Sequence, residues 1–234
     1  MRASPALAIL VCAAGIASTP AAALTLGQID TFSGSLQGWS AGGAPPFPPV
    51  LVKDGGPGGA GDSYMLVTST GSQSAGGKMV VLNDLQWAGN YTAAGITTIE
   101  LDLRNLGTTD LVMRLYFEDP AGGAPKNQAI TTQGFALAAG SGWTHVSFAI
   151  RASDLTTLTG SAAELLTNTT VLRLYHGPQL SFPGNPIAAK LGVDNVAAVP
   201  EPTSWALMIA GLGLIGALTR RSTGRADRRV APAR

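Results

Sequence analysis

The sequence of 234 residues contains few side chains that could carry out covalent or metal chemistry. Its two histidines are His145 and His176, and its one cysteine is Cys12. A Ser–His hydrolase needs a histidine beside an activated serine, and neither histidine lies in a local signature such as Gly-x-Ser-x-Gly. With so few histidine and cysteine side chains, zinc and thiolate chemistry are also disfavoured. We therefore expect a protein that is not an enzyme.

Carboxylates offer a second route to catalysis. A glycoside hydrolase needs two of them facing each other across a cleft. The candidates are Glu100, Asp102, Glu118 and Asp119. Period-2 alternation puts them on the solvent faces and in the turn of a predicted hairpin, so a glycan hydrolase remains only an alternative.

Aromatic side chains suggest a non-covalent role. Exposed Trp and Tyr rings bind sugars by stacking on the apolar faces of pyranoses, and amides and carboxylates nearby supply hydrogen bonds. Trp87 and Tyr91 lie in a segment rich in Gly, Asn and Gln, and Tyr116 alternates with Arg114 and Glu118. We predict that Trp87, Tyr91 and Tyr116 are exposed and bind a ligand.

These side chains must be held by a β-rich domain over residues 24–199. Short alternating runs recur there, separated by Gly- and Pro-rich segments. They are expected at 64–68, 79–82, 98–104, 111–117, 143–150, 171–175 and 191–196. Residues 105–110 are predicted to be a hairpin loop, the glycine-rich stretch 55–62 a connector between strands, and 153–168 a weak helix. This pattern predicts an all-β fold, an antiparallel β-sandwich or jelly roll.

The N-terminus has the features of a secretory signal peptide. Arg2 is followed by an apolar stretch from Leu7 to Ile16, and Ala21 and Ala23 form a small-x-small cleavage site. Residues 1–23 are therefore predicted to be a helical signal peptide removed by signal peptidase. Cys12 would leave with it, so the mature chain would contain no cysteine.

The C-terminus combines three unlike features in a fixed order. Pro200, Glu201 and Pro202 precede an uncharged apolar run from 205 to 218, and Arg220 and Arg221 follow it. Fourteen residues span about 21 Å as a helix, which is short for a hydrocarbon core of about 30 Å. A short transmembrane helix with transient retention is the expected behaviour.

Residues 200–221 resemble the PEP-CTERM sorting signal of Gram-negative bacteria. The resemblance implies export, an anchored precursor at the inner membrane, and recognition by an exosortase that processes the tail near Pro-Glu-Pro. It also implies a host that makes extracellular polysaccharide. Residues 222–234 are a basic extension, expected to stay cytoplasmic until processing.

Residues 24–199 resemble exported bacterial proteins with a domain like the galactose-binding-type jelly rolls of carbohydrate-binding modules. The resemblance rests on Phe32…Gly38-Trp39 near the start and Val193-Asp194-Asn195-Val196 near the end. It implies two sheets, often with a structural calcium ion near the first and last strands. Asp30 and Asp194 would be its ligands, since calcium prefers oxygen donors.

Together these features predict an exported protein of the cell surface or extracellular matrix, with a non-catalytic domain that binds or packs with exopolysaccharide. A structural envelope protein without a ligand is the main alternative. The domain carries 8 Lys and Arg against 12 Asp and Glu, a net charge of −4, so nucleic acid is not an expected partner.

Overall fold

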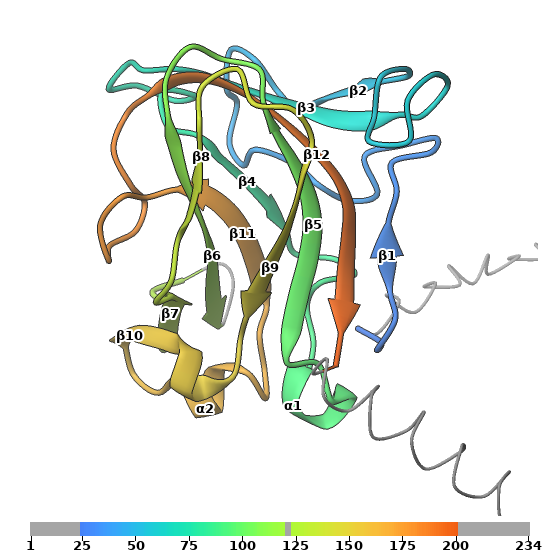
Figure 1. Ribbon diagram of the computed structural model, residues 1–234. Coiled ribbons are helices and arrows are strands. Elements are labelled where there is room, and N and C mark those ends of the chain that lie inside the picture. Colours follow the sequence, from blue (N-terminus) through green and yellow to red (C-terminus); the bar gives the residue numbers. More distant parts are fainter. Residues whose placement is uncertain (1–23, 120–122, 201–234) are drawn as a thin grey trace, which may run out of the picture.

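The computed structural model describes residues 24–119 and 123–200, which form a sandwich of two antiparallel sheets (Figure 1). Sheet A has the order β2-β3-β12-β5-β9, with β1 also paired to β12. Its strands are β1 (Ile29–Asp30), β2 (Val50–Val52), β3 (Tyr64–Thr70), β5 (Thr98–Asn105), β9 (Thr144–Ala149) and β12 (Ala188–Val199). The predicted all-β sandwich is confirmed.

Sheet B has the order β10-β7-β6-β11-β4, with β8 paired to β6. Its strands are β4 (Val80–Asn83), β6 (Leu111–Asp119), β7 (Asn127–Thr131), β8 (Phe135–Leu137), β10 (Leu155–Thr159) and β11 (Val171–His176). Apolar side chains from the inner faces of both sheets form one main core, among them Ile99, Leu101 and Leu103 of β5 and Leu115 and Phe117 of β6. Each such side chain contributes about 1.5–3 kcal/mol through burial.

The predicted hairpin between residues 98–104 and 111–117 is wrong. Strand β5 belongs to sheet A and β6 to sheet B, so residues 106–110 cross from one sheet to the other. The Asn105 side chain organises this crossing, because its Nδ2 donates to the carbonyls of Thr109 (2.8 Å) and Leu137 (3.2 Å). Alternation correctly identified the inward face of each strand, and those faces pack against each other across the sandwich.

The predicted helix over 153–168 is largely wrong. It is replaced by a 3-10 turn, η1 (Ala152–Asp154), then the edge strand β10, and then one short helix, α2 (Ala162–Leu165). Thr156, Thr157 and Thr159 favour a strand because their β-branched side chains suit a pleated surface. The helix begins only after Ser161, whose hydroxyl accepts from the Glu164 amide.

Strand β12 is central to sheet A, because it pairs with β3 and β1 on one side and with β5 on the other. A register shift between Asp194 and Ala197 breaks its ladder with β5, and Asn195 there has φ 51°. The strand ends at Val199, since Pro200 has no amide hydrogen to continue the ladder. Within residues 24–119 and 123–200, no helix is long and apolar enough to cross a membrane.

Candidate functional site

A buried carboxylate network occupies one end of the main core. Asp30 is 1% exposed, and its Oδ2 accepts hydrogen bonds from the indole nitrogens of Trp39 (2.7 Å) and Trp87 (2.6 Å). Its Oδ1 accepts from Gln86 Nε2 at 2.6 Å. Burial raises the pKa of the Asp30 carboxyl, and the three donors offset part of that effect.

The prediction that Trp87 and Tyr91 are exposed is wrong, because both side chains are buried in or beside this network. Trp87 is fully buried with its indole on Asp30, and the hydroxyl of buried Tyr91 donates to the Trp87 carbonyl at 2.8 Å. The Tyr91 ring also packs edge-on against Phe117, with the ring centroids 5.5 Å apart. The polar sequence around them reflects caps and turns, including the Asn90 cap of helix α1 (Tyr91–Ala94). Neither ring can stack on a sugar from these positions.

A second buried carboxylate, Asp194, lies on the outer face of sheet A. It pairs with Asp102 across β12 and β5, on the face opposite the core-facing Val193 and Leu103. Its Oδ1 accepts from the Asn195 amide at 2.7 Å, whereas Oδ2 is buried without a hydrogen-bond partner. Burial raises the pKa of Asp194 to about 7, and the nearby charges of Asp62 and Asp102 act in the same direction.

Asp62 belongs to the glycine-rich segment 55–62, which connects β2 to β3 as predicted. Its Oδ2 accepts from the Gly58 amide at 2.6 Å. A Cβ atom at Gly56 would lie 2.5 Å from that same oxygen, so a side chain there would push the Asp62 carboxylate aside. The segment is therefore held by its own hydrogen bonds.

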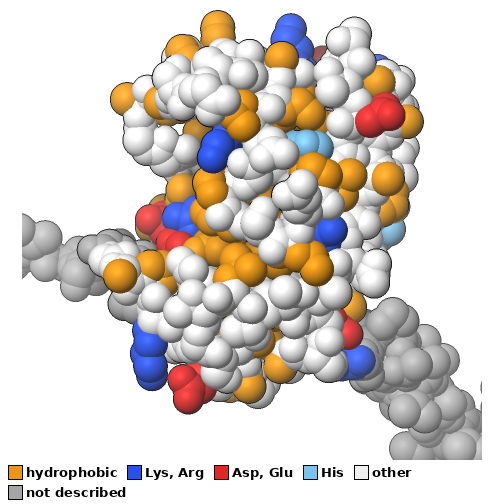
Figure 2. Space-filling model, turned by 90° about the vertical axis from the view of Figure 1, so that its left-hand side faces the viewer, with side chains coloured by type: hydrophobic (Ala, Val, Ile, Leu, Met, Phe, Trp, Pro, Cys, Tyr) orange, Lys and Arg blue, Asp and Glu red, His pale blue; other side chains and the backbone are white. Residues whose placement is uncertain are grey.

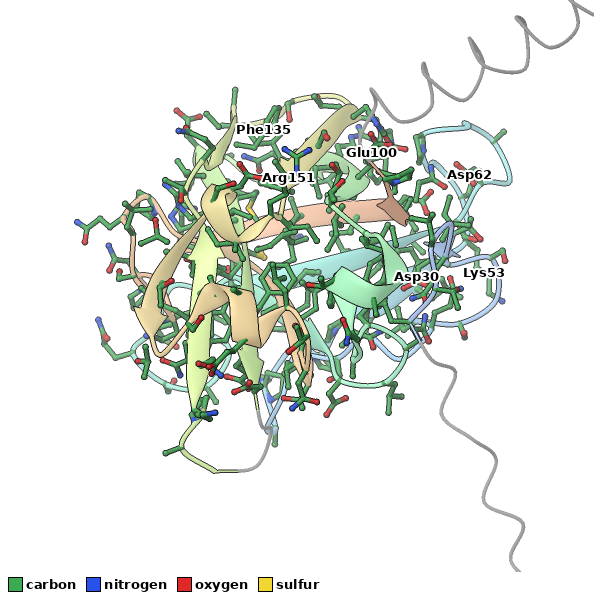
Figure 3. All side chains as sticks on the ribbon, turned by 90° about the horizontal axis from the view of Figure 1, so that it is seen from below. Asp30, Lys53, Asp62, Glu100, Phe135 and Arg151 are labelled. Atoms are coloured by element: carbon green, nitrogen blue, oxygen red, sulfur yellow. The ribbon has the colours of Figure 1, made fainter. Side chains whose placement is uncertain are left out.

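The structure does not bring Asp30 and Asp194 together as ligands of one calcium ion. Asp30 points into the core and its oxygens already hold three N–H donors, while Asp194 is on the opposite face of the sheet. Figure 3 shows Asp30 apart from Asp62, a loop residue whose negative charge raises the pKa of Asp194. Among the described residues, no group of three or more His, Cys, Asp or Glu is placed to hold a metal ion.

The outer face of sheet B carries a row of side chains that does not belong to the main core. Ile130 of β7, Tyr116 of β6 and Arg173 of β11 are paired in register across three neighbouring strands. Tyr116, Ile130 and Tyr175 form a separate small cluster, joined by Phe182 from the segment after β11. Figure 2 looks onto this side of the sandwich, where hydrophobic side chains gather in a hollow with charged side chains beside them.

Tyr116 is on the predicted outer face, but the prediction that it is exposed is wrong. It is 1% exposed because the Phe182 ring stacks on it, with centroids 3.9 Å apart and planes at 19°. The Arg173 guanidinium lies 5.2 Å from the Tyr116 ring centroid and 5.5 Å from that of Phe182. The stack is therefore a cation–π arrangement on the surface of a sheet.

Polar groups surround this aromatic stack. Tyr116 Oη donates to Glu118 Oε2 at 2.7 Å, and Glu118 Oε1 lies 2.7 Å from Arg173 Nη1. Gln128 of β7 also reaches the Tyr116 hydroxyl. Burial and Glu118 raise the pKa of Tyr116, and burial raises the pKa of Tyr175 to about 12, so both phenols are neutral near pH 7. The face thus combines aromatic rings, a guanidinium, a carboxylate and an amide.

No pattern in the sequence pointed to Phe182, because it lies in a Gly- and Pro-rich segment without periodicity. Arg173 and Tyr175 could have been found, since they alternate with the core residues Leu172 and Leu174.

The candidate catalytic side chains are divided between the two sheets, with one group on sheet A and another on sheet B. His145 Nδ1 is 3.0 Å from Asp102 Oδ1 and its Nε2 is 3.7 Å from Glu100, all on the outer face of sheet A. His176 Nδ1 accepts from the Val112 amide at 3.0 Å, and burial lowers its pKa. Glu118 and Asp119, predicted to be solvated, are buried on β6, where Asp119 accepts from the backbone and side chain of Asn127.

The sorting residues begin directly after the last strand of the described structure. Pro200 follows the last residue of β12, whose carbonyl accepts from the Thr97 amide at 3.2 Å. Glu201, Pro202, Arg220 and Arg221, the predicted cleavage residues Ala21 and Ala23, and the predicted signal and transmembrane helices lie outside the described residues.

Residues 198–222 match the PEP-CTERM protein-sorting motif. The resemblance seen in the sequence is therefore confirmed, and the chain carries this sorting signal of exported proteins. The match overlaps the last two residues of β12. The chain matches no curated protein.

The fold is similar to solved structures of proteins that act on or bind polysaccharides. An exo-β-agarase shares 9% identity over 76% of this chain and 25% of its own, with a TM-score of 0.51. A family 11 carbohydrate-binding module from Clostridium thermocellum shares 15% identity over 76% of this chain and 99% of its own, with a TM-score of 0.47. The CBM22-1 xylan-binding domain of Paenibacillus barcinonensis Xyn10C shares 11% identity over 76% and 99%, with a TM-score of 0.42. At these identities the likeness concerns the fold alone.

Asp194 predicts a specific dependence of stability on pH. Its pKa is 3.8 when unperturbed and about 7 in the folded chain, so its stabilising contribution is complete below about pH 4 and is lost as the pH rises through 7. In calcium-free buffer, Asp194→Asn should remove that dependence. Between about pH 4 and about pH 8, the wild type should lose up to about 4 kcal/mol of unfolding free energy relative to the variant. Urea unfolding at both pH values measures it, and parallel pH profiles would contradict the assignment.

Proposed function

We propose that this chain, which carries a PEP-CTERM sorting motif, is the exported precursor of a non-catalytic glycan-binding protein of the cell surface or extracellular matrix. In this proposal the precursor is held at the inner membrane of a Gram-negative bacterium by residues 200–221 and is released after exosortase processing near Pro200–Pro202. The β-sandwich then binds or packs with extracellular polysaccharide. The observation that carries the binding role is the row of aromatic, charged and amide side chains on the outer face of sheet B.

The chemistry of that face suits a neutral pyranose. The Tyr116 ring, which Phe182 covers in this structure, has a flat apolar surface of the kind on which the C–H face of a sugar stacks. Tyr175 lies nearby and meets the same Phe182 ring edge-on. The Arg173–Glu118 pair and Gln128 offer both donors and acceptors to hydroxyl groups, and Arg173 and Glu118 together are neutral in charge. The face therefore favours recognition by stacking and hydrogen bonds, with no bond made or broken.

The separation of the candidate catalytic groups supports a non-catalytic role. Glu100 and Asp102 lie side by side on the outer face of sheet A, whereas Glu118 lies on sheet B and is engaged by Tyr116 and Arg173. A hydrolase that retains or inverts configuration needs two carboxylates facing one bond from opposite sides. Among the described candidates, this arrangement is not formed.

Arg173→Ala should weaken glycan binding by about tenfold or more, because it removes the only side chain among the three registered residues that donates charged hydrogen bonds. The full chain would be titrated calorimetrically with cellohexaose, xylohexaose and agarohexaose in a zwitterionic detergent without a sugar headgroup. Lys190→Ala is the matched control, since Lys190 is an exposed cation on sheet A. Absence of saturable binding by a folded wild type to all three probes would leave a structural envelope protein.

The sorting half of the proposal makes a separate prediction. A reporter carrying residues 198–234 should be shortened and released in the native host, and should accumulate as an uncut membrane form when the exosortase is deleted. Glu201→Ala should reproduce the accumulation. Immunoblots of membrane and medium fractions measure both, and unchanged processing in the deletion strain would overturn exosortase dependence.

We also propose a structural calcium ion near the last strand. Asp194 would be a ligand of this ion, and Asp30 would not. The support is the fit of one donor: Asp194 Oδ2 is buried without a partner, and calcium prefers carboxylate oxygens. Its other ligands would be carbonyl groups and water, because the described residues hold no group of three suitable side chains.

If this proposal is right, about 1 mM calcium added to the chelator-treated full chain at about pH 8 should raise its melting temperature by about 2–6 °C. Asp194→Asn should abolish the shift, because the amide removes the negative charge. Equal melting with and without calcium, or an undiminished shift in the variant, would rule out this ion.

A further inference from the structure

The segment that connects β11 to β12, residues 177–187, crosses the outer face of sheet B and is fixed at both ends. Gly177 donates its amide to the Val112 carbonyl at 2.9 Å, and its own carbonyl accepts from Arg114 Nε at 2.7 Å. Arg114 is itself buried and held by the carbonyls of Thr131 and Thr132. At the other end, the Ile187 amide donates to the Gly77 carbonyl at 2.9 Å.

Between these anchors, the segment rests on the sheet through a small set of contacts. The Phe182 ring stacks on Tyr116 and meets the edge of Tyr175, with centroids 5.2 Å apart. The Tyr175 hydroxyl donates to the Ser181 carbonyl at 3.1 Å. Most of the other side chains are directed to solvent, and Leu180 is 48% exposed. The tip is thus held mainly by one aromatic ring.

The Phe182 ring occupies the place that a bound sugar ring would take in the proposed function. It lies nearly parallel to Tyr116 at stacking distance, and the Arg173 guanidinium lies beside both rings, 5.2 Å from the centroid of Tyr116 and 5.5 Å from that of Phe182. The cluster beneath it is separate from the main core, so lifting Phe182 would uncover Tyr116 without opening the space between the sheets.

We propose that residues 177–187 form a self-occupying lid, with Phe182 as an internal substitute for the pyranose ring of a neutral polysaccharide. This inference rests on the proposed function and assigns its regulation. A ligand must displace Phe182 before it can stack on Tyr116, so the closed lid lowers the apparent affinity by the fraction of open molecules. The bound sugar then takes over the contacts that Phe182 made with Tyr116, Tyr175 and Arg173.

The lid is tested first without any ligand. Tetranitromethane nitration of the full chain, mapped by mass spectrometry, reports the accessibility of individual tyrosines. Phe182→Ala should increase nitration of Tyr116 at least tenfold and leave the core residue Tyr91 unchanged. Leu180→Ala, in the same segment but outside the stack, should resemble wild type. Tyr116 staying as unreactive as Tyr91 in Phe182→Ala, or Tyr91 becoming reactive as well, would overturn the lid.

The second measurement is calorimetric titration of the same proteins with cellohexaose, xylohexaose and agarohexaose. Phe182→Ala should bind one of these probes about tenfold more tightly than wild type and Leu180→Ala, because its site is already open. Weaker binding by Phe182→Ala would overturn the lid and make Phe182 part of the binding surface. If Phe182→Ala exposes Tyr116 to nitration but binds no probe, the movable cover is supported and the proposed glycan function fails.

Discussion

The Asp30 carboxylate joins the parts of the chain that close the domain. It brings together β1, the loop that carries Trp39 and the segment that carries Gln86 and Trp87, none of which is joined to the others by a long ladder. Burying a carboxylate among indoles costs free energy unless hydrogen-bond donors contact it, and three N–H groups donate to Asp30 here. Loss of the acid would leave the indole nitrogens of Trp39 and Trp87 unpaired inside the core. Asp30 therefore determines where Trp87 lies, and through the Trp87 carbonyl it also positions Tyr91.

This use of aromatic residues leaves the two outer faces of the sandwich with different characters. Trp39, Trp87 and Tyr91 are committed to the interior, while Trp143 packs beside Tyr64 on sheet A and hydrogen-bonds to the Gly55 carbonyl. Gly192 makes room for that indole, since a Cβ there would lie 2.8 Å from the ring. On sheet B, Tyr116 and Tyr175 face outward and are covered by a loop instead of by another sheet. Cover of that kind can be displaced at the cost of few contacts, unlike the inter-sheet core.

Alternation predicted much of the fold because inward faces repeat every second residue. It located β3, β4, β9 and β11 and the core positions of β5 and β6. It could not tell that β5 and β6 belong to different sheets, because an apolar face fits either a hairpin or the two sides of a sandwich. The site was harder to predict for a similar reason. The alternation of side chains correctly predicted that Tyr116 lies on an outer face. Its burial, however, depends on Phe182, which is 66 residues away and lies in a segment without periodicity. Trp87 looked like an exposed loop residue because its partner, Asp30, is distant in sequence.

The position of the sorting motif has a mechanical consequence for the domain. The motif starts within β12, which is hydrogen-bonded on both sides along its length, so a force on the tail is carried into the centre of sheet A. The described chain leaves the sandwich at the end near α1, whereas the hollowed face of sheet B is on its side (Figures 1 and 2). A precursor tethered through Pro200 would therefore present that face laterally and not toward its point of attachment. In the proposed function, retention at a membrane and contact with a polysaccharide are then compatible in the same molecule, and processing of the tail would move the proposed binding face without changing its structure.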